Sequence, residues 1–227
     1  MTSKAGRINW LDRVRGLACL LMLLHHGLYD TEFIFQKRLG LGPKFYYYLH
    51  ILIVALFISS SALSASQARR QSPRGVKRQV LAATLLLLTT SAISVISDLN
   101  LYIFWNLLMV LALARLLLYL LKDLRDSQYE LVVMITGILI SLVSKYIADG
   151  SIEKLPAQAD YLSNWPWLFY FIVIYLLFRR FPLQALNIRQ EAARDPLACL
   201  GRHALLFYFL HQPILLLLLK GLFTCLD

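Results

Sequence analysis

The residues of this chain best suited to chemistry are an arginine and a histidine on one face of its first apolar segment. Arg15 and His26 are eleven residues apart, and eleven steps of about 100° on an α-helix return to within about 20° of the starting direction. Asp30 lies one turn after His26, close to the same stripe. A neutral histidine beside a carboxylate is suited to act as a general base or a nucleophile. The planar donor fork of an arginine is suited to bind phosphate or another anion.

A second polar group occurs in the last apolar segment, at a similar expected depth. His211 is nine residues beyond Arg202, or about 13–14 Å along a helix, whereas His26 is about 16 Å beyond the arginine that opens the first segment. The two histidines are therefore predicted to lie at nearly the same level on different helices. Gln212 follows His211 and Tyr208 precedes it by one turn. We expect one site in which His26, Asp30 and His211 are catalytic, while Arg15, Gln212 and Tyr208 bind substrate.

The elements that must position these residues are long apolar segments. The 227 residues are 59% hydrophobic and 16% charged, whereas soluble domains average about 45–50% and about 25%. Read for spans of about 20 apolar residues, the sequence predicts seven transmembrane helices, at 15–35, 46–66, 80–97, 100–121, 129–148, 165–178 and 203–223. The expected fold class is therefore all-α: a polytopic integral membrane helical bundle, with residues 1–227 forming a single domain.

The distribution of the 23 Lys and Arg residues predicts the orientation of this bundle. Most of them lie in the N-terminal segment and in alternate loops, so the positive-inside rule predicts a cytoplasmic N-terminus and an outer C-terminus. The expected location is the plasma (inner) membrane, with multi-pass topology. Because the net charge of +10 follows the topology, we expect membrane lipids, and not nucleic acid, as partners.

Other polar residues have more ordinary interpretations. The three cysteines show neither a disulfide framework nor metal-ligand spacing, so no metal is expected. His25 is about 100° from the Arg15 face and is expected to pack between helices. Asp160, in the outer loop before the sixth helix, is a candidate to face an acceptor. The competing interpretation is that intramembrane histidines only join helices, and that Arg15 only anchors at the interface.

The first and last apolar segments carry motifs that resemble a known family. Residues 7–26 read R-x-x-x-L-D-x-x-R-G-L-A-x-L-L-M-x-x-x-H, and the last helix contains LGRHAL (200–205), Tyr208 and HQPIL (211–215). These motifs resemble the bacterial relatives of the heparan-alpha-glucosaminide N-acetyltransferase catalytic domain, within a broader group of transmembrane acyltransferases. The resemblance touches most of the chain, and the first and last motifs are its specific part.

The resemblance implies acyl transfer, most often of acetyl from acetyl-CoA as a cosubstrate on the cytoplasmic side. The acceptor would be the amine or hydroxyl of a glycan or another small molecule at the outer face. On this view Arg15 lies toward the anionic CoA, His26 midway, and Asp30 toward the acceptor. The sequence is also compatible with a homo-oligomer.

Two other functions remain open from the sequence. The same buried Arg, His and Asp residues could serve a proton-coupled transporter, although no inverted repeat accompanies the helix that contains Pro213. A non-catalytic membrane scaffold is the other alternative. It is favoured by residues 104–108, which read FWNLL where the resembling family carries a run that ends in histidine.

Overall fold

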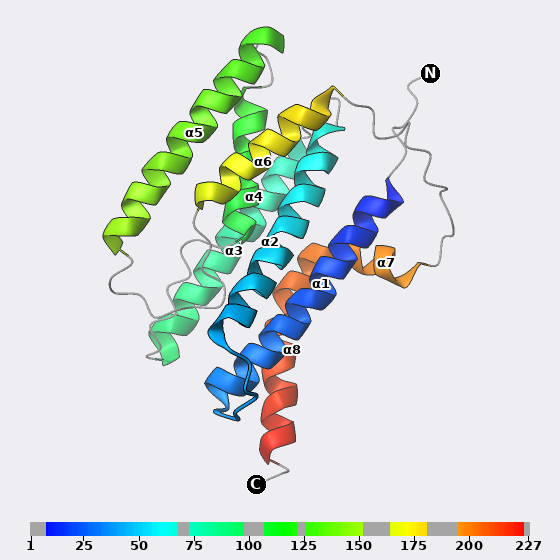
Figure 1. Ribbon diagram of the computed structural model, residues 1–227, viewed down its shortest axis with the longest axis vertical. Coiled ribbons are helices and arrows are strands. Elements are labelled where there is room, and N and C mark those ends of the chain that lie inside the picture. The colour runs from blue at the N-terminus through cyan, green and yellow to red at the C-terminus, as the bar shows by residue number, and fades with distance from the viewer. Residues whose placement is uncertain are drawn as a thin grey trace. The chain divides into compact units, whose positions relative to one another are not determined.

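A computed structural model describes residues 8–67, 73–97, 107–121, 126–151, 164–180 and 195–224. The described residues are mostly helical and include no strand, which confirms the predicted all-α class (Figure 1). The helices, with one π-helical turn (η1), are α1 (Asn9–Tyr29), η1 (Asp30–Ile34), α2 (Pro43–Ser66), α3 (Pro73–Ser97), α4 (Leu107–Leu120), α5 (Asp126–Ser151), α6 (Asn164–Arg179), α7 (Pro196–Arg202) and α8 (Ala204–Thr224).

Each of the seven predicted spans coincides with a described helix. Two of these helices, α2 and α8, are long and apolar enough to cross a membrane by length and composition, as expected for a helical membrane protein. The number of crossings and the sides of the termini stay predictions. The short helix α7, which precedes the last span, was not among the predicted elements.

The chain divides into two compact units. The first contains residues 1–60 and 184–227, and therefore α1, η1, most of α2, α7 and α8. In this unit α7 lies across the N-terminal half of α1, and α8 runs beside α1 (Figure 1). All the described candidate site residues belong to this unit.

The α1 helix buries the stripe that the sequence predicted. Cys19 and Met22 lie between Arg15 and His26 on the buried side. On other faces Leu17, Leu20 and Leu24 are each more than 40% exposed, as is appropriate for side chains that meet lipid. The buried stripe of α1 therefore combines apolar packing with ionisable groups.

The α7 helix is held against α1 by its cap and by a close backbone approach. Asp195 is the N-cap residue, and its side chain accepts hydrogen bonds from the backbone N–H groups of Leu197 and Ala198. A Cβ atom on Gly16 would overlap the carbonyl of Leu197, and one on Gly201 would overlap the carbonyl of Asp12. Glycine at these two positions allows the helix backbones to touch.

The α8 helix buries few of its residues within the structure. Tyr208 and His211 are buried, whereas leucines on its other faces, such as Leu206, Leu217 and Leu218, are mostly exposed. Pro213 lies inside the helix without ending it. A single buried polar stripe on an otherwise apolar exposed helix is the pattern expected where lipid covers the rest.

The second unit, residues 61–183, contains α3 to α6. It contains a buried hydroxyl pair in which the Oη atoms of Tyr129 and Tyr175 are 3.1 Å apart, and the Arg179 guanidinium lies 4.3 Å from the centre of the Tyr129 ring. The sixth helix begins at Asn164, so Trp165, Pro166 and Trp167 belong to its first turn.

Candidate functional site

The centre of the candidate site is a pair of buried histidine rings from α1 and α8. The ring centroids of His26 and His211 are 4.9 Å apart, and the two residues are 4% and 6% exposed. The structure thus brings together two residues that the sequence placed at one depth. Two imidazoles at this separation can share or exchange a proton, directly or through one water molecule.

The protonation pattern of His211 follows from its hydrogen bond to the backbone. Its Nδ1 atom lies 2.8 Å from the carbonyl oxygen of Tyr208. A carbonyl oxygen can only accept, so Nδ1 carries the hydrogen and Nε2 is the basic atom of the neutral ring. A histidine oriented in this way is prepared to act as a base. Tyr208 therefore contributes its main-chain carbonyl, in addition to a side chain 5.8 Å from the His211 ring.

Next to the histidine pair, α1 and α8 are joined by a second polar contact. The Nε2 group of Gln212 donates to Oδ2 of Asp30 over 2.9 Å, and Asp30 is 1% exposed. Asp30 also begins the π-helical turn η1, in which Phe35 N–H donates to the Asp30 carbonyl. Turns of this type occur frequently at functional sites because they redirect side chains.

Arg15 is anchored by two partners at the opposite end of the stripe. One terminal nitrogen donates to Asp12 Oδ1 over 2.9 Å, and the other donates to the carbonyl oxygen of Ser60 in α2 over 3.1 Å. Asp12 is 1% exposed, whereas the Arg15 side chain keeps 18% of its surface accessible. The guanidinium is thus held in a fixed orientation and remains partly accessible.

A cluster of titratable side chains from α1, η1 and α2 adjoins the histidine pair. The His25 ring lies 5.4 Å from that of His26 and 5.8 Å from that of His50. It also lies 6.1 Å from the Tyr46 ring, and the Tyr46 hydroxyl donates to the Glu32 carboxylate. Because consecutive helical residues point about 100° apart, His26 faces α8 while His25 faces α2.

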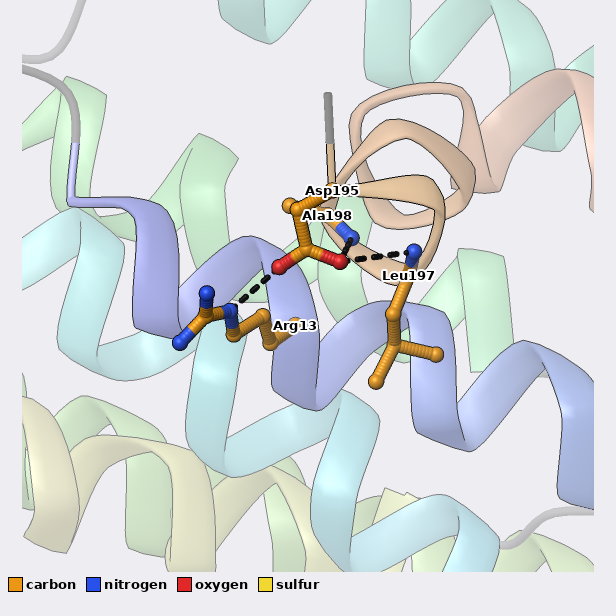
Figure 2. Close-up of polar contacts among 4 residues, drawn as sticks. All are labelled: Arg13, Asp195, Leu197 and Ala198. Atoms are coloured by element: carbon orange, nitrogen blue, oxygen red, sulfur yellow. Dashed lines mark hydrogen bonds and ion pairs between the residues drawn. The ribbon is translucent and has the colours of Figure 1, made fainter. Parts of the chain in front are cut away.

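An ion pair fixes α7 near the N-terminal end of the site. Figure 2 shows the Arg13 guanidinium donating to Asp195, whose other oxygen accepts from the backbone of Leu197 and Ala198. Hydrogen bonding from Arg13 holds the pKa of the Asp195 carboxyl below its usual value, since the charged form is the bonded form. The charge of Asp195 is therefore retained wherever the protein is folded near neutral pH.

The predicted site residues thus fall into three groups. His26 and His211 meet, Asp30 meets Gln212, and Arg15 lies on the same α1 stripe with its own partners. Asp160 lies outside the described residues. Within the described ranges no group of three or more His, Cys, Asp or Glu could hold a metal ion, and the expectation of no metal stays a prediction.

The sequence interpretation missed three participants. Asp12 and His50 are ionisable residues inside or beside apolar segments. Ionisable side chains are energetically costly in a membrane, and this cost alone marked both residues as candidates. Gly201 allows α7 to pack closely against α1. A small residue in the motif before the last helix was the sequence feature that could have predicted this contact. All three were visible as residue types, but their partners were not.

Comparison with known proteins gives a family match over most of the chain. The model of the family described as "Heparan-alpha-glucosaminide N-acetyltransferase, catalytic" matches residues 7–213, a range that includes both histidines of the pair. No curated protein and no solved structure gives a significant match.

Proposed function

Since the chain belongs to the heparan-alpha-glucosaminide N-acetyltransferase catalytic family, we propose that it is a membrane-embedded acyltransferase. The acyl group is acetyl and comes from acetyl-CoA on the cytoplasmic side of the plasma membrane. The acceptor is the amine or hydroxyl of an extracytoplasmic glycan or similar small molecule. The observation that carries the proposal is the buried His26–His211 pair, with ring centroids 4.9 Å apart.

The pair supplies the base that acyl transfer requires. An acceptor nitrogen or oxygen attacks the thioester carbonyl, so that a new C–N or C–O bond forms while the C–S bond breaks. His26 removes a proton from the attacking atom and the departing thiolate takes up a proton. His211, oriented by the Tyr208 carbonyl, exchanges protons with His26. Burial excludes water, which favours transfer to the acceptor over hydrolysis.

The residues on either side of the pair are proposed to bind the two substrates. Arg15 offers a positively charged fork to the CoA portion of the donor. Asp30 and Gln212 form a polar contact at the other end, suited to hold an amine or hydroxyl. With the predicted orientation, Arg15 lies toward the cytoplasm and Asp30 toward the outside. Asp160 remains a proposed acceptor-side residue on the strength of its predicted loop.

The test is acyl transfer by the purified full-length protein in liposomes. Acetyl-CoA is supplied with glucosamine, which offers both an amine and hydroxyls, and products are identified by mass spectrometry. His26→Gln is expected to reduce the rate by about 10²- to 10⁴-fold, the usual contribution of a general base. His203→Gln is the matched control, because His203 is exposed at the junction of α7 and α8.

The result that would overturn the mechanism is full activity in His26→Gln. The proposed function itself would fail if the wild-type protein, correctly folded by circular dichroism, transferred no acyl group to amine or hydroxyl acceptors.

A further inference from the structure

Four histidine rings in the first unit form one continuous row. The order is His211, His26, His25 and His50, with successive centroid separations of 4.9, 5.4 and 5.8 Å. The chain contains five histidines, so only His203 stands outside the row. Acyl transfer as proposed requires the first two rings, and it leaves His25 and His50 without a role.

The row runs from the interior toward the surface. His211, His26 and His25 are buried, whereas His50 is only half-buried. A branch leaves His25 through the Tyr46 ring, whose hydroxyl donates to Glu32, and Glu32 is also half-buried. The row therefore has two partly accessible ends, at His50 and at Glu32, and one buried end.

We propose that His25 and His50, with the Tyr46–Glu32 branch, relay protons between the buried His26–His211 pair and the surface of the protein. Neighbouring rings at these separations can pass a proton through a direct N–H···N bond or one water molecule. Histidine suits this task because each ring can accept a proton at one nitrogen and release it from the other. Chains of His, Asp and Glu side chains carry protons through other membrane proteins.

The relay rests on the proposed function, with an amine as the acceptor. An amine is largely protonated at neutral pH, so it loses two protons when it becomes an amide. One of these protons goes to the CoA thiolate as the C–S bond breaks, and the other must leave the buried pair. A hydroxyl acceptor loses one proton, which the thiolate takes, and then no net proton travels along the row.

The titratable and charged groups that face His25 come from each element packed against it. They are His26 and Tyr29 of α1, Tyr46 and His50 of α2, and Glu32 of η1 through the Tyr46 hydroxyl. The Asp30–Gln212 contact lies beyond His26 and joins α1 to α8. Among the described ring contacts, those that lead from the catalytic pair to His50 and to the Tyr46–Glu32 contact pass through His25.

If His25 only packs between helices, its substitution has a different expected effect than if it relays protons. Substitution by phenylalanine distinguishes these two roles. His25→Phe keeps an aromatic ring among the neighbouring rings but removes both nitrogen atoms. The measurement is solvent exchange of the imidazole N–H protons of His26 and His211, by NMR on full-length protein labelled with ¹⁵N-histidine. It needs no substrate, so it remains informative if the proposed function is wrong.

A relay predicts that His25→Phe slows this exchange by about 10²-fold or more, the lower end of the proton-transfer effects of positioned side chains. His25→Gln keeps a polar side chain, so it provides the test if the phenylalanine variant does not fold. It is expected to slow the exchange as well. His203→Gln should leave the exchange rate unchanged. Unaltered exchange in both folded His25 variants would overturn the relay.

Acyl transfer gives a second measurement of the same proposal. His50→Ala should lower kcat for amine acceptors, leave KM for acetyl-CoA unchanged, and regain activity when imidazole is added at the half-buried end of the row. If exchange slows in the His25 variants while the wild-type protein transfers no acyl group, the relay stands and the proposed function fails. If transfer occurs and His50→Ala matches the wild type at every pH, the His50 end of the relay is wrong.

Discussion

Arg13 of α1 donates to the same Asp195 carboxylate that caps α7 (Figure 2). One oxygen of this carboxylate receives the guanidinium and the other receives the backbone of the first turn of α7. The N-terminal end of α7 is thus tied to α1 by charge, while the helix backbones touch at Gly16 and Gly201. Since α8 begins directly after α7, these contacts determine the position of α8 along α1, and therefore the position of His211.

The two functions of Asp195 can be separated by substitution. Asp195→Asn keeps the cap, because asparagine caps helices as well as aspartate does, and loses the ion pair. Asp195→Ala loses both. We expect a small decrease in Tm for Asp195→Asn, similar to that for Arg13→Gln, and a clearly larger one for Asp195→Ala, all measured in the same detergent. Equal losses in the two Asp195 variants would contradict the capping role.

The Asp195 carboxyl should also give the protein an acid-dependent loss of stability. Its folded-state pKa is lowered from 3.8, chiefly by the Arg13 hydrogen bond, so the unfolded chain binds the proton more readily. The contribution to stability is complete above this ordinary value and is lost as pH falls through the lower folded value. In Arg13→Gln the decrease in Tm below about pH 4 should be shallower. An unchanged slope would contradict this assignment.

The close approach of α7 to α1 should not tolerate a methyl group. A Cβ atom on Gly201 meets the main-chain oxygen of Asp12, which cannot move without displacing α1. Gly201→Ala is expected to destabilise the fold by about 1–3 kcal/mol, as overpacking usually does, and to reduce acyl transfer because His211 shifts. Gly221→Ala is the matched control, because nothing lies within 4 Å of its added Cβ.

Gly221→Ala should leave stability unchanged or slightly raised, since alanine favours a helix over glycine. Thermal unfolding of both variants provides the comparison. A stable and active Gly201→Ala protein would show that α7 does not need its close contact with α1.

The meeting of His26 and His211 could be predicted because it depends only on regular geometry. Both residues were counted from an arginine expected at the same interface, and the α-helical rise per residue is nearly constant. The buried stripe of α1 followed from the same periodicity. The His26 and His211 ring centroids are 4.9 Å apart, and this closeness also requires that α1 and α8 be neighbours. Counting residues along each helix could not predict that the two helices are neighbours.

The break between α7 and α8 could not be predicted in the same way. Residues 196–224 contain mainly good helix formers. The helix α7 nevertheless ends at Arg202, with His203 as its C-cap, although no proline or glycine follows His203 directly. The boundary depends on packing against α1, a contact between residues almost 200 positions apart. The Ser60 partner of Arg15 was hidden for the same reason, because its carbonyl belongs to another helix.

The Asp30–Gln212 hydrogen bond should be measurable as a coupling between α1 and α8. Asp30→Ala, Gln212→Ala and the double variant form a cycle in which the coupling is the departure from additivity. Side-chain hydrogen bonds between membrane helices average about 0.6 kcal/mol and reach about 1.7 kcal/mol. Because the Asp30 acceptor is buried, we expect this pair in the upper part of that range. Additive effects on unfolding would contradict the contact.

Arg15 is expected to need its guanidinium as well as its charge. Two separate nitrogens bind Asp12 and the Ser60 carbonyl, a geometry that a lysine ammonium cannot reproduce. Arg15→Lys should therefore lower Tm, and it should raise KM for acetyl-CoA about tenfold or more if the cation faces the donor, with a smaller change in kcat. Asp12→Asn is the companion variant, because it removes the ion pair while the guanidinium keeps its charge and its bond to the Ser60 carbonyl. A KM that rises equally in both variants would show that the orientation of Arg15 controls donor binding. A decrease in Tm with an unchanged KM in both would show that Arg15 joins α1 to α2 and does not bind the donor.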